Sequence, residues 1–225
     1  PTFTTLAAQS GAPFSINDIV PIANHLTEAG VVAVKADSPY KTIEELVAAA
    51  KEKGNLKAST NGNKASNHTA AQLLAKSAGF KYKAIPYGGT ADQLLALRQG
   101  EVDFTCAKVA DVAKLVKGDK PELRVLAVFN TKRDPELPNV PTLGEKGLYP
   151  EWYGSARALV APKGTKPEVI QYYVEAFKKT MQDPAVIEAH KKAGMALDFK
   201  DNKELGDLIK AQDKFARDVV NDLYK

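Results

Sequence analysis

Short apolar runs and helical patterns alternate along the middle of the chain. The first apolar run, residues 31–34, precedes a helical pattern that begins with a capping box from Thr42 to Glu45 and stops at Gly54. Each of the next units predicts a strand that leads through a loop into a helix, and the predicted strands are 56–60, 82–87, 102–106 and 123–129. Strands that alternate with helices of this length are typical of βαβ units. The pattern therefore predicts an α/β fold with a mostly parallel sheet.

The two ends of the chain follow a different pattern. Residues 1–19 are rich in turn-forming residues and show few periodic apolar positions, so we expect them to be irregular. An apolar strand is predicted at 158–161, and the residues after it are mainly helical. We therefore expect two lobes. Residues 31–161 would form one lobe of βαβ units, called lobe 2, and residues 1–30 and the mainly helical residues 162–225 would together belong to the other, called lobe 1.

The composition excludes several classes of protein. With 225 residues, 44% of them hydrophobic and 26% charged, the chain has the make-up of a globular protein and not of a disordered or fibrous one. The 31 Lys and Arg residues outnumber the 27 Asp and Glu residues, and the net charge of +4 favours small anions only weakly. No block of basic residues suggests a nucleic-acid partner, and no run of about 18 apolar residues could span a membrane.

Candidates for catalytic or metal chemistry are few. Cys106 is the only cysteine, so an internal disulfide is impossible, and a buried core position is favoured over a nucleophile. His25, His68 and His190 lack the spacing of a metal site, although His68 could orient a neighbouring loop. No nucleophile motif is present. We therefore expect no catalytic residues, no metal and no cofactor.

Two loops that follow predicted strands, residues 59–66 and 87–90, are rich in small and polar residues. In open α/β sheets, ligands bind where the carboxyl ends of strands lead into helix N-termini. Backbone N–H groups and the helix dipole at such ends attract a carboxylate or a phosphate. The candidate ligand-binding residues in these loops are Thr60, Asn61, Gly62, Asn63, Ala65, Ser66, Tyr87, Gly88, Gly89 and Thr90.

Simpler interpretations of these residues stay open. Ser66 and Thr90 could be ordinary helix N-caps, and the glycines could serve tight turns. Lys64 could face the anion or be solvated. Arg157, beside a predicted hinge, is a further candidate for carboxylate binding, with a surface ion pair as the alternative. Neither loop contains a nucleotide-binding motif.

Longer motifs occur in a fixed order along nearly the whole chain. Residues 85–90 read IPYGGT, residues 98–103 read RQGEVD, residues 137–147 read LPNVPTLGEKG, and residues 161–165 read APKGT. They resemble the VPYKGS, LxxGxVD, LPDVPTxxExG and APAGTP segments of the solute receptors of tripartite tricarboxylate transporters, often called Bug proteins. Residues 59–68 are similar to the ASSGNGSATH loop of the same family. The segment 137–147 is the most specific of these matches.

The resemblance implies a two-lobed receptor of the type II periplasmic binding-protein fold. It would bind a small carboxylate between its lobes and deliver it to the membrane permease subunits of a tripartite tricarboxylate transporter. In this family, backbone N–H groups, hydroxyls and ordered water hold the carboxylates, with little use of salt bridges. We accordingly expect a periplasmic monomer without a nucleic-acid partner.

The chain departs from the family at several places. The family's opening strand and glycine-rich first loop are missing, so we expect the N-terminal part of lobe 1 to be absent from this chain. Because the chain begins with Pro1, we also expect a processed or truncated product whose signal peptide lies outside it. Lys64 and Ala65 stand where Gly and Ser are usual, and Ala107 stands where many members carry Asp.

Two other functions remain as alternatives. The chain could be the effector-sensing domain of a transcription regulator with the same fold, which would need a helix-turn-helix at its N-terminus. It could also be an enzyme on the binding-protein fold, which would need a nucleophile or a metal cluster.

Overall fold

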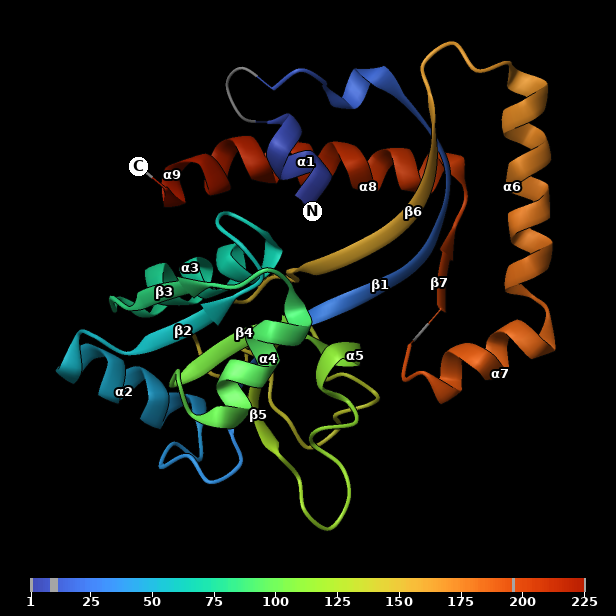
Figure 1. Ribbon diagram of the computed structural model, residues 1–225. Coiled ribbons are helices and arrows are strands. Elements are labelled where there is room, and N and C mark those ends of the chain that lie inside the picture. The colour runs from blue at the N-terminus through green and yellow to red at the C-terminus, as the bar shows by residue number, and fades with distance from the viewer. Residues whose placement is uncertain (1, 9–11, 196, 225) are drawn as a thin grey trace. The chain divides into compact units, whose positions relative to one another are not determined.

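The chain folds into two compact units, which are described separately (Figure 1). Unit 1 consists of residues 1–28 and 156–225, and unit 2 consists of residues 29–155. The computed structural model describes residues 2–8, 12–195 and 197–224. The chain passes between the units inside two strands, β1 (Ile19–Lys35) and β6 (Gly154–Pro162). The unit boundaries therefore fall earlier than the predicted divisions after residues 30 and 161, because the apolar runs at 31–34 and 158–161 are only parts of these longer strands.

The sheet of unit 2 is mixed, with both parallel and antiparallel pairings. Its strands are the second part of β1, β2 (Lys57–Thr60), β3 (Lys83–Pro86), β4 (Phe104–Lys108) and β5 (Leu123–Phe129), in the order β3-β2-β4-β1-β5. Strand β2 runs parallel to both β3 and β4. Strand β1 runs antiparallel to β4 and β5, so these two strands point the same way. The predicted α/β fold is confirmed, but the expectation of a mostly parallel sheet is not: the sheet is mixed, because β1 runs antiparallel to both of its neighbours in this unit.

Four helices belong to unit 2: α2 (Ile43–Lys53), α3 (Ser66–Ala78), α4 (Thr90–Gln99) and α5 (Val109–Val112). The capping box of α2 is confirmed, because Thr42 Oγ1 accepts from the Glu45 backbone N–H and Glu45 Oε2 accepts from the Thr42 backbone N–H, both at 3.2 Å. Gly54 ends the helix with a φ of 66°. The core of the unit is aliphatic and combines strand residues such as Val31 and Val128 with helix residues such as Leu97.

Within its described residues, unit 1 combines three strands with helices from both ends of the chain. Its strands are the first part of β1, most of β6, and β7 (Leu197–Lys200), and both β6 and β7 pair with β1. Its helices are α1 (Thr2–Ala7), η1 (Ile16–Asp18), α6 (Pro167–Met181), α7 (Pro184–Lys192), α8 (Asn202–Phe215), η2 (Ala216–Val220) and α9 (Asn221–Leu223). The expectation that residues 1–19 are irregular was wrong for α1. A helix this short is unstable alone, and its packing against α8 accounts for it.

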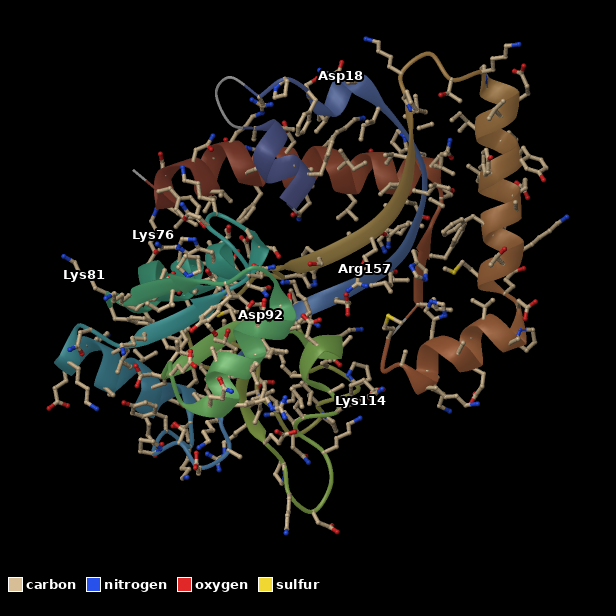
Figure 2. All side chains as sticks on the ribbon, in the orientation of Figure 1. Asp18, Lys76, Lys81, Asp92, Lys114 and Arg157 are labelled. Carbon is tan, nitrogen blue, oxygen red and sulfur yellow. The ribbon has the colours of Figure 1, made fainter. Side chains whose placement is uncertain are left out.

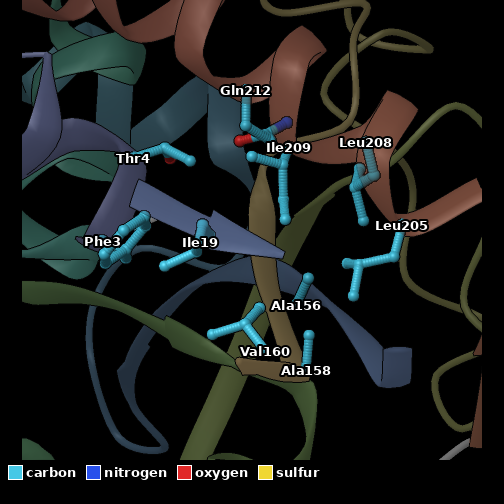
Figure 3. A pocket seen from close by; sticks show the side chains of 10 residues that line it. All are labelled: Phe3, Thr4, Ile19, Ala156, Ala158, Val160, Leu205, Leu208, Ile209 and Gln212. Carbon is cyan, nitrogen blue, oxygen red and sulfur yellow. The ribbon is translucent and has the colours of Figure 1, made fainter. Parts of the chain in front are cut away.

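An apolar pocket of about 230 Å³ lies inside unit 1 (Figure 3). Helix α1 contributes Phe3, strand β6 contributes Ala158 and Val160, and helix α8 contributes Leu208 and Ile209. In the part of the chain that the structure describes, no helix combines the length and apolar character that crossing a bilayer requires.

We expect Gly30→Ala to destabilise unit 2 by about 1–3 kcal/mol, because a methyl group there would be overpacked. The Gly30 N–H donates to Tyr153 O at 2.8 Å, and a Cβ on Gly30 would lie 3.0 Å from that oxygen and 3.2 Å from the Phe129 ring. Urea unfolding measures the change.

The matched control is Gly206→Ala inside α8, where the nearest atom to an added Cβ is 3.6 Å away. Here the same substitution should stabilise by about 0.5–1 kcal/mol through helix propensity. Equal effects of the two substitutions would contradict the contact at Gly30.

Candidate functional site

The two predicted loops lie side by side at one edge of the unit 2 sheet. Strands β2 and β3 are parallel neighbours, with Thr60 opposite Pro86, so both end at this edge. The backbone N–H of Tyr87 donates to Thr60 O at 2.9 Å and joins the starts of the two loops. We call residues 61–65 the first loop and residues 87–89 the second loop. With Thr60, Ser66 and Thr90, they contain all the candidate ligand-binding residues except Arg157.

Both loops lead into helices whose N-caps lack a capping side chain. Helix α3 starts at Ser66 with Ala65 as its N-cap, and helix α4 starts at Thr90 with Gly89 as its N-cap; neither cap makes a side-chain hydrogen bond. The interpretation of Ser66 and Thr90 as N-caps is therefore wrong, since both are the first residues of their helices. Each N-terminus carries a partial positive charge of roughly half a unit. The parallel arrangement places two such charges at the same sheet edge.

The two helix N-termini differ in their electrostatics. Asp92 lies in the first turn of α4, where its carboxylate offsets part of the helix dipole (Figure 2). Helix α3 has no acidic residue in its first turn. An anion at this edge is therefore favoured at α3.

Local hydrogen bonds fix the conformation of the first loop. Gly62 and Lys64 both have positive φ, 119° and 57°. The Lys64 backbone N–H donates to His68 Nδ1 at 2.9 Å, and the Asn67 backbone N–H donates to Asn61 Oδ1 at 3.3 Å. His68 therefore holds this loop in place, which is the role that the sequence analysis suggested for it. The Lys64 residue itself is exposed.

A buried chain of side-chain amides connects the first turns of the two helices. Gln93 in α4 has no exposed surface, and its Oε1 accepts from Asn67 Nδ2 in α3 at 2.9 Å. Gln93 Nε2 donates to Cys106 O at 2.7 Å and also to Thr105 Oγ1. Ser59 Oγ donates a hydrogen bond to Thr105 Oγ1, and Thr105 Oγ1 donates to Ser59 O, which links strands β2 and β4. Sequence analysis missed this network, because its members are far apart in the sequence and each is unremarkable alone.

Lys108 is the second feature that the sequence analysis missed. It is the last residue of β4 and is only 4% exposed. Its Nζ donates to Ser66 Oγ at 3.3 Å and to Asn67 Oδ1. The available signal was a lysine between Cys106-Ala107 and Val109, an apolar context in which lysine is rarely found.

Two other residues that the sequence analysis considered for a functional role, Cys106 and Arg157, have structural roles. Cys106 has no exposed surface, and burial raises the pKa of its thiol to about 12, which fits a core residue and not a nucleophile. Arg157 lies in unit 1 on β6, where its guanidinium pairs with the buried Glu28 carboxylate at 2.9 Å (Figure 2). Arg157 and the two loops therefore belong to different units. Among the described residues, no three His, Cys, Asp or Glu side chains are placed to hold a metal ion.

Comparisons with known proteins agree on one family. Residues 3–223 match the family model described as "Tripartite tricarboxylate transporter family receptor". The "UPF0065 protein in gbd 5′ region" of Cupriavidus necator is 37% identical over 170 residues, which cover 75% of this chain and 50% of that protein. The chain thus spans about half the length of this curated relative.

Solved structures show the same fold. A TctC solute binding protein from Polaromonas superposes with a TM-score of 0.81 at 26% identity, covering 97% of this chain and 75% of that one. MatC from Rhodopseudomonas palustris, solved with bound malate, gives a TM-score of 0.82 at 22% identity, covering 96% and 75%. At 22% sequence identity, the similarity to MatC shows only that the fold is shared.

We expect the first loop to loosen in acid, because His68 accepts a hydrogen bond through Nδ1 and must be neutral to do so. Burial and, to a lesser extent, the charge of Lys64 hold the pKa of His68 below its usual value. A lowered pKa means that the stability contributed by neutral His68 is present above the unfolded pKa of about 6.5 and is lost as the pH falls through the folded pKa.

Hydrogen exchange of the Lys64 amide, corrected for its intrinsic rate, should show less protection at pH 5 than at pH 7. The variant His68→Gln should show a smaller change with pH. The pKa of His25, in unit 1, is also lowered by burial, so His25→Gln is the matched control and should leave the Lys64 amide unaffected. A pH response at Lys64 that persists in His68→Gln would contradict this account.

Proposed function

The chain belongs to the tripartite tricarboxylate transporter receptor family, and we propose that it binds a small carboxylate and delivers it to the membrane permease subunits of such a transporter. The proposal includes a periplasmic location and action as a monomer. Unit 2 would be the lobe that supplies the two loops, and unit 1 would be the other lobe.

The adjoining N-termini of α3 and α4 are the observation that carries this proposal. A carboxylate accepts hydrogen bonds from backbone N–H groups, and the helix dipoles favour its negative charge. The hydroxyl of Ser66 and the amides of Asn61 and Asn63 lie in the same segment and add neutral hydrogen-bonding groups. Thr60 has no exposed surface, and its hydroxyl donates to Gly62 O at 3.3 Å. Recognition of this kind binds an anion and provides no group that would transform it.

A dicarboxylate is the class of solute to test first. The structure of MatC shows that this fold can hold malate. The site concentrates positive partial charge from two helix N-termini. A ligand with two carboxylates would interact with this charge more favourably than a ligand with one. We therefore choose malate, succinate and adipate as probes.

Calorimetric titration of residues 1–225 with each of these acids tests the proposal. Saturable binding of at least one acid is expected, with an affinity that weakens as the salt concentration rises. Uniform absence of saturable binding would count against a carboxylate receptor.

The variant Gly62→Ala should weaken the binding of the acid at least tenfold. Gly62 has a φ of 119°, in a region that residues with a Cβ rarely adopt, so the substitution forces the first loop into another conformation. Calorimetric titration with the acid that binds most tightly measures the change.

Gly79→Ala is the matched control for Gly62→Ala. Gly79 ends α3 with a φ of 70° and has open space around it, so this substitution should destabilise the fold by roughly 1–2 kcal/mol while leaving the affinity unchanged. If Gly62→Ala bound the acid as tightly as the control did, the first loop would not be the binding element.

A further inference from the structure

A pair of histidines joins strand β1 to helix α7 within unit 1. His25 Nε2 lies 2.6 Å from His190 Nε2, and the two rings are nearly perpendicular, with an angle of 87° between their planes. The Phe177 ring of α6 also packs against His25, at a centroid distance of 6.3 Å. Both histidines are half-buried, so the pair is a partly desolvated contact between the strand and the helix.

The positions of the protons in this pair follow from a second contact. His190 Nδ1 lies 2.7 Å from Val186 O, and a carbonyl oxygen can only accept, so this nitrogen carries a proton. In the neutral pair, His190 Nε2 is therefore the acceptor and His25 Nε2 the donor. One added proton, at His25 Nδ1, leaves this hydrogen bond intact. A second would set two N–H donors and two positive charges against each other.

Helix α7 has few other contacts with the interior of unit 1. Val186 and His190 are its half-buried residues, one turn apart, and its other residues are exposed. The aliphatic core of unit 1 includes Ile22, Ala161 and Val174, and no residue of α7 belongs to this core in the part of the chain that the structure describes. A helix of 9 residues is marginal on its own in water. The histidine pair is therefore a main attachment of α7.

We propose that His25 and His190 form an acid-sensitive latch, which holds α7 against β1 while at least one imidazole is neutral and releases the helix when both are protonated. This inference concerns unit 1 and does not depend on the proposed function. Because α7 lies outside the aliphatic core, its release would leave that core in place. Unit 1 would then respond to acid by a local opening and not by unfolding.

The cations around His25 oppose its protonation. Burial, the charge of His190 and the charge of Arg157, in this order of size, lower the pKa of His25. Arg157 is held in place by the Glu28 carboxylate, 2.9 Å away. The stability that neutral His25 contributes is thus present above its unfolded pKa of about 6.5 and is lost as the pH falls through the folded pKa.

The other elements beside the pair offer little to offset a second positive charge. Helix α6 presents the uncharged Phe177 ring to His25. Asp198 in β7 pairs with Lys200 at 2.7 Å, and Glu188 in α7 lies 3.9 Å from Lys192. Both carboxylates therefore already have cationic partners, and separation of the two rings is the direct way to relieve the repulsion.

Hydrogen exchange of the α7 amides, corrected for their intrinsic rates, tests the proposal on the unchanged chain. Protection of α7 should fall at least tenfold between pH 7 and pH 5, because the released helix binds one proton more than the latched one and a free histidine has a pKa of about 6.5. The amides of α6 should keep their protection. Constant protection of α7 over this range, or an equal loss in α6, would overturn the inference.

The variant His190→Gln should lose most of the pH response of α7. Glutamine does not titrate, and its Oε1 can accept from His25 whether His25 is neutral or charged. His68→Gln is the matched control, since it removes a histidine of unit 2 whose pKa is also lowered by burial, and the response of α7 should persist in it. A full pH response of α7 in His190→Gln would overturn the latch. The measurement on the unchanged chain decides the matter if His190→Gln does not fold.

Discussion

The candidate site depends on the parallel pairing of β2 with β3 and β4. Parallel neighbours end at the same sheet edge, and each of these strands leads directly into the next helix. The pairing brings the first loop, the second loop and Lys108 together, although Ser66 and Lys108 are 42 residues apart in the sequence. Without this register, the helix N-termini would remain separate weak sites for an anion.

The buried polar groups of unit 2 make this arrangement specific. An unsatisfied polar group in the core would be costly, whereas Ser59, Gln93 and Thr105 satisfy one another across α4, β2 and β4. A shift in the pairing of β2 with β4 would separate these partners. The network therefore stabilises the same register that positions the two loops.

Much of the fold could be predicted from the sequence, because its signals are local. The capping box at Thr42, the strand–loop–helix repeats and the motif at 137–147 all lie within short segments. The full length of β1 could not be predicted, because polar residues such as Asn24 and Glu28 interrupt its apolar pattern. In the structure, these two side chains are buried, with Asn24 bonded to the Asp198 carbonyl and Glu28 paired with Arg157.

Only part of the candidate site could be predicted, because only its loops give a local signal in the sequence. Its loops are visible as runs of small and polar residues, whereas the positions of Ser66 and Thr90 relative to their helices depend on where the backbone turns. Lys108 could not be identified, because its significance comes from a contact with α3 that only the sheet register creates.

The central claim is that a carboxylate binds to the main chain at the adjoining starts of α3 and α4. Amide ¹H–¹⁵N spectra recorded during a titration with malate, succinate or adipate test it most directly. Shifts concentrated at the amides of residues 61–68 and 87–92 would support the claim. Saturating shifts that leave these amides unchanged and cluster elsewhere in the chain would contradict it.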